Sequence, residues 1–171
     1  MNELGFEFKV TECNGWPKIR ISIDDDVYQE HEFSSSHECV SVPIDLLDGD
    51  HNLAIEIYGK SQSSTVVKDQ QIIQDQLVTL ENIFVDNVKL PDNFKYSGTY
   101  GQQPSCLTWG ENNKQWLWNF STPIIDWILK EKHRLTEEKY GDHYDLWSEK
   151  KKENYLRLLD KFENDINSLN I

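Results

Sequence analysis

Apolar and polar residues alternate with a period of two through most of residues 5–90, and this pattern limits the fold more than any other feature of the sequence. Phe6, Phe8 and Val10 share one face of a predicted strand, with Glu7 on the other. Such alternation is typical of antiparallel strands with one buried face and one face in water. The same spacing recurs in Ile19, Ile21 and Ile23, in Val40, Val42 and Ile44, and in Leu53, Ile55 and Ile57, while Val27, Gln29, His31 and Phe33 form a weaker set.

Short amphipathic strands need a second sheet to cover their apolar face. Asn14-Gly15 is a dipeptide that tolerates positive φ at both positions of a hairpin turn. In residues 77–86 the alternation changes phase after Glu81-Asn82, which predicts a β-bulge. The fold class predicted is mainly β, an antiparallel β-sandwich of the jelly-roll type.

The pattern changes near residue 121. Residues 91–113 are predicted to form a long polar loop with a short strand at Leu107-Thr108-Trp109, and residues 114–120 another strand. Ser121-Thr122-Pro123 supplies a hydroxyl cap and a proline for the first position of a helix. The domains predicted are therefore a β-sandwich over residues 1–121 and a C-terminal helical extension over residues 122–171.

The last predicted helix is amphipathic. Ser148 is in position to cap it, and apolar residues then recur at helical spacing, opposite a charged face. A helix appended to a complete sandwich must cover the flank of the sandwich or another chain. The residues predicted to dock a partner are Tyr155, Leu158, Leu159, Phe162 and Ile166.

The charge and the composition exclude several classes of partner. A net charge of −13 disfavours binding to nucleic acid or to anionic lipid. The sequence contains no run of 18 apolar residues, so no membrane span is predicted. The first ten residues lack the features of a signal peptide. Cys13, Cys39 and Cys106 are expected to be reduced, as in a chain made in a cytosol.

The chemistry-bearing residues do not form a catalytic or metal-binding pattern. Nucleophile-elbow, P-loop and zinc-protease motifs are missing, so the chain is predicted not to be an enzyme. His37 and Cys39 lack a second pair of ligands for zinc. Acids at 24–26 and at Asp48 and Asp50 favour hydrated turns over a cation site. The aromatic row Trp116, Trp118 and Phe120 is predicted to lie in the core or against a helix, the alternative being an exposed platform for sugar rings.

The segment from His51 to Leu90 resembles the small calcium-dependent carbohydrate-binding modules that recognise xylan. The resemblance lies in GDHNLAIEIY, in Asp75-Gln76-Leu77-Val78 and in VDNV at 85–88. Gly59-Lys60 stands where that family has Asn-Asp, so an ammonium would take the cation position and could pair with Asp75 or Asp69. No cofactor is predicted, and calcium stays the alternative.

The strings IYGKSQSSTVVKDQQIIQDQLVTLENIFVDNVKL and LTWGENNKQWLWNFSTPIIDWIL also resemble small virion proteins of tailed bacteriophages. This resemblance implies a structural, tail-associated component of the particle, made in the host cytoplasm, that binds other virion proteins in an oligomeric assembly. One alternative is a carbohydrate-binding module for a host-surface glycan, and another is an assembly chaperone for a fibre. The residues predicted to contact a glycan are Trp16, Tyr28, Tyr58 and Trp109.

Overall fold

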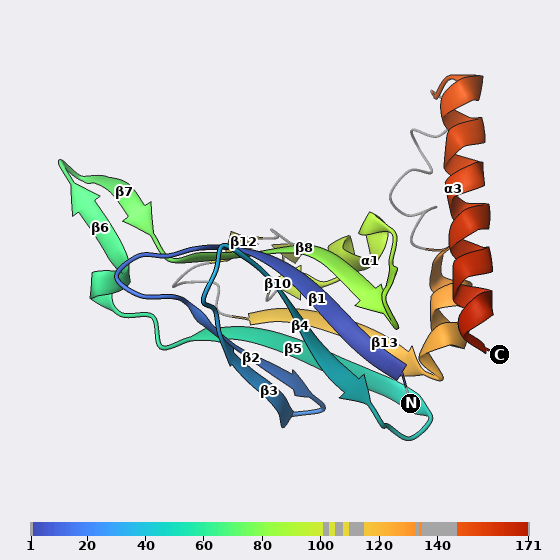
Figure 1. The fold of residues 1–171 in the computed structure, drawn as a ribbon, viewed down its shortest axis with the longest axis horizontal. Helices are drawn as coiled ribbons and strands as arrows, with labels where there is room; N and C mark the ends of the chain where they lie inside the picture. Colours follow the sequence, from blue (N-terminus) through green and yellow to red (C-terminus); the bar gives the residue numbers. More distant parts are fainter. Residues whose placement is uncertain are drawn as a thin grey trace.

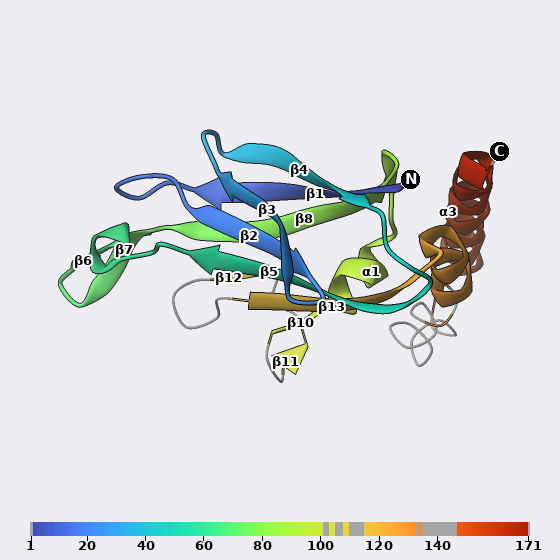
Figure 2. The same ribbon diagram turned by 90° about the horizontal axis from the view of Figure 1, so that it is seen from below.

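The protein is a β-sandwich with helices at its C-terminal end. The computed structural model describes residues 2–100, 103–104, 108–109, 115–132, 134 and 147–170. Two antiparallel sheets, here called sheet A and sheet B, face each other. Figure 2 shows β4, β1 and β8 in one layer and β2, β5 and β13 in the other. The predicted fold class, mainly β with a C-terminal helix, is confirmed.

Sheet A has the strand order β12-β8-β1-β4, and β9 also pairs with β8. Leu4, Phe6 and Phe8 of the central strand are fully buried, as the alternation predicted. The pairing of β1 with β8 shifts register between Glu7 and Phe8, and it passes over Glu81, so the predicted bulge is confirmed. The strands are β1 (Asn2–Thr11), β4 (His37–Ile44), β8 (Leu77–Val85), β9 (Val88–Lys89) and β12 (Thr108–Trp109).

Sheet B has the strand order β11-β10-β13-β5-β2-β3, with β5 paired on both edges. The predicted inward positions on β2 and β5 are buried, whereas Val27 on the edge strand β3 is 55% exposed. An edge strand has a neighbour on one side only, which explains its weaker pattern. The strands are β2 (Lys18–Ile23), β3 (Asp26–Glu32), β5 (Gly49–Tyr58), β10 (Thr99–Tyr100), β11 (Gln103–Pro104) and β13 (Gln115–Thr122).

A separate two-stranded hairpin projects from one end of the sandwich (Figure 1). It consists of β6 (Thr65–Lys68) and β7 (Gln71–Asp75), after a 3-10 turn at Gln62–Ser64. Gln74 Nε2 donates to the Glu12 carbonyl at 3.0 Å, which ties the base of the hairpin to the turn after β1. We call the end of the sandwich that carries this hairpin the hairpin end.

The tight turns have the left-handed backbone that their residues predict. Asn14 and Gly15 have the predicted positive φ values, 53° and 120°. The predicted hairpin was wrong, because this turn connects β1 of sheet A to β2 of sheet B, which do not pair with each other. Asp24 and Asp25 have φ values of 50° and 70° and connect β2 to β3. Aspartate tolerates this conformation better than most residues because its short side chain accepts local hydrogen bonds.

The prediction of a long polar loop over residues 91–113 was wrong in its first part. Residues Asp92–Tyr96 form the helix α1, and strands β10, β11 and β12 follow. Phe94 is fully buried and contacts Trp127 edge-on, with ring centroids 5.7 Å apart. A single buried aromatic in a polar segment has no periodicity that sequence reasoning could detect. Residues 110–114 lie outside the described residues.

The C-terminal part begins with a helix over residues 124–132, followed by α3 (Glu149–Asn167) and a 3-10 turn at Ser168–Asn170. Pro123 precedes the first helix instead of occupying its first position, because β13 continues through Thr122. The predicted hydroxyl cap was wrong. Ser121 Oγ donates to Asp50 at 2.5 Å, and Thr122 Oγ1 donates to the Leu47 carbonyl at 2.6 Å. The predicted cap of α3 is confirmed, since Ser148 accepts from the Lys151 N–H.

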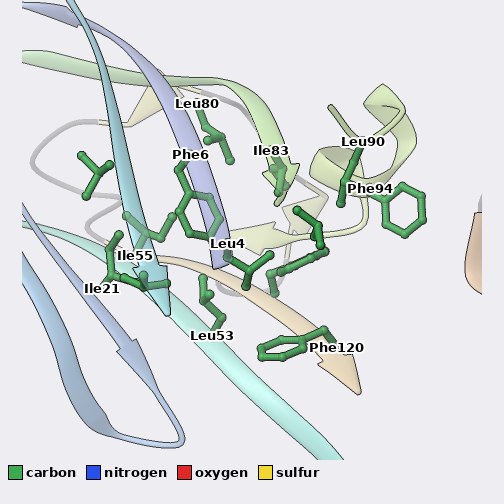
Figure 3. Packing of buried hydrophobic residues seen from close by; sticks show 14 of the residues in the cluster. Leu4, Phe6, Ile21, Leu53, Ile55, Leu80, Ile83, Leu90, Phe94 and Phe120 are labelled. Carbon is green, nitrogen blue, oxygen red and sulfur yellow. The ribbon is translucent and has the colours of Figure 1, made fainter. Parts of the chain in front are cut away.

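One apolar core extends from the sheets into the helices. Figure 3 shows side chains from both sheets in this core, among them Leu4, Phe6 and Leu53. Phe162 and Ile166 of α3 belong to the same cluster. Burying each large apolar side chain contributes roughly 1.5–3 kcal/mol. The division into domains at residue 121 stays a prediction. In the part of the chain that the structure describes, none of the helices has both the length and the hydropathy to cross a bilayer.

Candidate functional site

Three of the four predicted glycan residues belong to segments that meet at the hairpin end. β2 and β5 pair Lys18 with Tyr58, which brings the residues just before β2, including Trp16, to the end where Tyr58 lies. On sheet A, Trp109 pairs with Val78, near the start of β8. The side chain of Trp109 lies outside the described residues. This end of the sandwich is therefore the place to look for a binding site.

Tyr28 is placed differently. It lies in β3, where the pairing with β2 shifts register between Ile21 and Ser22. Its side chain is partly buried and packs against the core. Tyr28 lies beside Ile21 and Ser22, in the half of β2 away from Lys18, so it is not brought together with Lys60 at the hairpin end.

Lys60 and Asp75 form a buried ion pair at the hairpin end. Lys60 Nζ lies 2.7 Å from Asp75 Oδ1 and donates to the Gln76 carbonyl at 3.1 Å. The Thr65 hydroxyl donates to the same carboxylate oxygen at 2.6 Å. The side chain of Lys60 is 6% exposed and that of Asp75 is 19% exposed. Burial raises the pKa of Asp75, but the hydrogen bonds from Lys60 and Thr65 outweigh burial and hold the pKa below its usual value.

Within the described part of the chain, the geometry at the hairpin end does not assemble the oxygen ligands of a calcium site. Calcium takes six to eight oxygen ligands with several carboxylates among them. Of the predicted positions, Lys60 pairs with Asp75, while Asp69 lies at the hairpin turn with φ 52°. Among the described residues no three His, Cys, Asp or Glu side chains come close enough to hold a metal ion. The ammonium of Lys60 already neutralises the partly buried carboxylate of Asp75.

Tyr58 is held in place by a neighbouring arginine. The Arg20 guanidinium lies 4.9 Å from the centroid of the Tyr58 ring. Arg20 is itself fixed by Glu30 at 2.8 Å and by Glu56 at 3.7 Å. Sequence reasoning did not include Arg20 in the site. Its signal was available in the outward-facing positions of β2 and β5, where cross-strand neighbours carry complementary groups.

A set of side-chain amides ties the turn after β1 to the segments that flank the hairpin. Gln76 Nε2 donates to the Gly15 carbonyl at 2.7 Å, and Asn14 Nδ2 donates to the Ser63 carbonyl at 2.6 Å. Gln76 is only 7% exposed. These bonds fix the segment on which Trp16 lies, and sequence reasoning missed them because they join residues far apart in the chain.

The aromatic row on β13 lies in the core, as predicted, and the alternative of an exposed platform was wrong. Trp116, Trp118 and Phe120 are at most 2% exposed. Their rings stack along the strand, with centroids 6.1 Å and 5.7 Å apart. Trp127 from the following helix contacts Trp118 edge-on at 5.3 Å. This row therefore anchors the helix to sheet B and presents no face to a ligand.

The residues predicted for partner docking divide into two groups. Leu159, Phe162 and Ile166 are buried, the latter two in the core of this chain. Leu158 is 63% exposed, and its neighbour Leu156 is 50% exposed. A groove of about 660 Å³ lies between α3 and residues 87–93. Its apolar lining consists of Val88, Leu90, Pro91, Tyr155, Leu158, Leu159 and Phe162.

Comparisons with known proteins give matches among solved structures. No family model and no curated protein matches the chain. The matched chains are carbohydrate-binding modules. One is the selenomethionine form of vCBM60, from work that links two families of calcium-dependent carbohydrate-binding modules by circular permutation. It is 13% identical to this chain, the match covers 68% of this chain and 83% of that chain, and the TM-score is 0.40. Another is vCBM60 in complex with galactobiose, 10% identical, covering 70% and 97%, with a TM-score of 0.42.

Proposed function

We propose that this protein is a non-catalytic carbohydrate-binding module whose binding surface is the hairpin end and whose binding does not require a metal. The observation that carries the proposal is the placement of two partly exposed aromatic residues, Trp16 and Tyr58, in segments that hydrogen bonds and ion pairs join at one end of the sandwich. A sugar offers an apolar ring face and a rim of hydroxyl groups. Sites of that kind need aromatic surface together with a few fixed polar groups.

The polar framework at this end is held in place before any ligand arrives. Arg20, which pairs with Glu30 and Glu56, lies over the Tyr58 ring. The Lys60–Asp75 pair and the Gln76 amide restrain the segments on either side of the hairpin. Rigid side chains lose less entropy on binding, so a small contact area gives more affinity. The Lys60 ammonium supplies the positive charge beside Asp75 that a calcium ion would otherwise supply.

Glycan-array screening of the full chain, followed by calorimetry with the best glycan, tests this proposal. We expect binding that is unchanged by a chelator and is lost in Tyr58→Ala and weakened in Trp16→Ala. Tyr96→Ala is the matched control, because Tyr96 is 41% exposed and lies on α1. The proposal fails if no glycan binds with or without calcium. It also fails if Tyr58→Ala binds as tightly as the wild type while Tyr96→Ala does not.

A second candidate function is docking of a protein partner on the groove beside α3, as expected of a component of a bacteriophage particle. The observation that favours it is the exposure of Leu158 at an apolar groove. The assignment to a virion and to its tail stays a prediction from the sequence. Mass spectrometry of purified particles tests for the chain itself. Leu158→Asp should then prevent its incorporation, whereas Leu47→Asp, at an 89% exposed leucine in the loop before β5, should not.

A further inference from the structure

His51 lies at the start of β5 and connects three segments at the end of the sandwich opposite the hairpin. Its Nδ1 lies 2.6 Å from Asp24 Oδ2, on the turn between β2 and β3. Its Nε2 lies 2.9 Å from the Leu47 carbonyl and 3.1 Å from Thr122 Oγ1. His51 is 9% exposed, and its ring lies against that of Phe120 with centroids 5.5 Å apart.

The protonation state of His51 follows from counting the hydrogen atoms that these contacts need. An ionised carboxylate and a backbone carbonyl only accept hydrogen bonds. Asp24 therefore requires a proton on Nδ1, and Leu47 requires one on Nε2 or on Thr122 Oγ1. The Thr122 hydroxyl donates to the Leu47 carbonyl at 2.6 Å. With its only proton used there, Thr122 cannot also donate to His51, so the ring satisfies every contact only when both nitrogens carry a proton.

We propose that His51 is a pH-dependent switch that, in its charged form, fixes the junction between β13 and the helix over residues 124–132. When His51 loses a proton, Nδ1–H stays with Asp24 and Nε2 becomes an acceptor. The Thr122 hydroxyl then has one proton for two acceptors, Nε2 and the Leu47 carbonyl. One of them is left without a partner, which weakens the attachment of Thr122 to the loop before β5. Thr122 directly precedes Pro123 and the helix.

The groups that face His51 favour its charged form. The acidic groups are Asp24 on the β2–β3 turn and Asp50 on β5 itself, while β13 contributes Phe120 and Thr122. Neither aspartate forms an ion pair with a lysine or an arginine among the described residues. Burial lowers the pKa of His51, but the hydrogen bonds to Asp24 and Leu47 and the charges of both aspartates outweigh burial, so the pKa is raised.

The direction of the pH effect follows from this pKa. Because the pKa of folded His51 lies above that of an unfolded histidine, about 6.5, its contribution to stability is fully present below that pH. The contribution is lost as the pH rises through the pKa of the folded state. Each pKa unit between the two states corresponds to about a tenfold change in the equilibrium. The junction is therefore expected to be held more firmly in mildly acidic than in alkaline solution.

Two measurements on the full chain test the switch. Nitrogen-15 NMR of the histidine rings reports directly whether both nitrogens of His51 are protonated at each pH. Hydrogen exchange of the backbone amides of residues 115–128, corrected for its intrinsic pH dependence, reports how often the junction opens. We expect a ring that is doubly protonated at pH 6, and a loss of protection whose midpoint coincides with the titration of His51. A neutral ring at pH 6, or protection that does not follow the titration, would overturn the proposal.

Variants separate a switch from a merely structural histidine. Asp24→Asn leaves an oxygen to accept the Asn52 N–H, which Asp24 Oδ1 now accepts at 2.9 Å, but removes the charge beside Nδ1. Both the titration of His51 and the midpoint of exchange should then move to lower pH together. His51→Gln should abolish the pH dependence, and His37→Gln, at an exposed histidine on β4, should retain it. If His51→Gln does not fold, Asp24→Asn alone tests the proposal. An exchange midpoint that does not move in Asp24→Asn, although the titration of His51 does, refutes the switch.

Discussion

Replacing Lys60 with methionine removes one member of a buried ion pair and leaves the carboxylate of Asp75 without its cation. The pair has a contact of 2.7 Å, with side chains 6% and 19% exposed. Breaking a buried pair from one side costs roughly 3–5 kcal/mol. Asp75 keeps the Thr65 hydroxyl and some contact with water, which places the expected loss near the lower end, about 3 kcal/mol. For a chain of this length, that loss lowers Tm by about 6–12 °C.

The assay is urea unfolding followed by tryptophan fluorescence at pH 7. Lys68→Met is the control, since Lys68 is exposed on β6 and should change the free energy of unfolding by less than about 0.5 kcal/mol. The double variant Lys60→Met with Asp75→Leu should recover part of the loss, because it removes the stranded charge along with its partner.

Acid provides a second readout of the same pair. Because the pKa of Asp75 is lowered in the folded state, the contribution of the pair is present above the pKa of an unfolded aspartate, about 3.9. It is lost as the pH falls through the folded pKa. The reasoning is refuted if Lys60→Met is as stable as the wild type at pH 7, or if Lys68→Met costs as much.

Three further predictions concern other parts of the fold. Gly98→Ala should destabilise the protein by at least about 1–3 kcal/mol in urea unfolding, because a Cβ there would lie 2.2 Å from the buried Trp116 ring. Ser148→Ala should reduce the stability of α3 by about 1 kcal/mol, measured by helical circular dichroism during unfolding, because it removes the cap. Glu38 should contribute stability that is complete above about pH 4.3 and lost towards pH 2. Burial raises its pKa, but bonds from Ser34, His31 and Ser35 outweigh burial and lower the pKa to about 2, so an acid titration of Glu38→Gln should lack this step.

The sandwich could be predicted from the sequence because the periodicity of its strands is a local signal. Phe6, Phe8 and Val10 are buried where the alternation placed them, and the phase change after Glu81 is a bulge. The turn at Asn14 was predictable for the same reason, since turn chemistry depends on adjacent residues. Each of these features depends on residues that lie within about ten positions of one another in the sequence.

The helix α1 and the exact start of the C-terminal helix could not be predicted. α1 has five residues, too few to show helical periodicity, and it is stabilised by the burial of Phe94. Pro123 follows a strand that continues because β13 pairs with β5 as far as Gly49. Such long-range pairing overrides the local preference for a capped helix.

Some residues of the candidate site could be named from the sequence, and their role stays a prediction. Trp16 and Tyr58 were named from their residue types, and Lys60 from its departure from a resembling family. The structure adds Arg20 and Gln76, whose roles depend on contacts across strands and between distant turns. No pattern along the chain reports which side chains a fold brings together, so Tyr28 was named on the same grounds and lies elsewhere.

The continuity of the apolar core has a consequence for how this protein can be divided. Ile124, Ile128 and Ile166 are at most 1% exposed and belong to the cluster that contains Phe6. Cutting the chain before residue 122 would uncover the side of sheet B against which Trp127 packs. The fragment would then expose an aromatic surface and would tend to aggregate. Strands and helices should therefore melt in one transition, and a tag or fusion partner is better tolerated at the chain ends than between β13 and the helix that follows it.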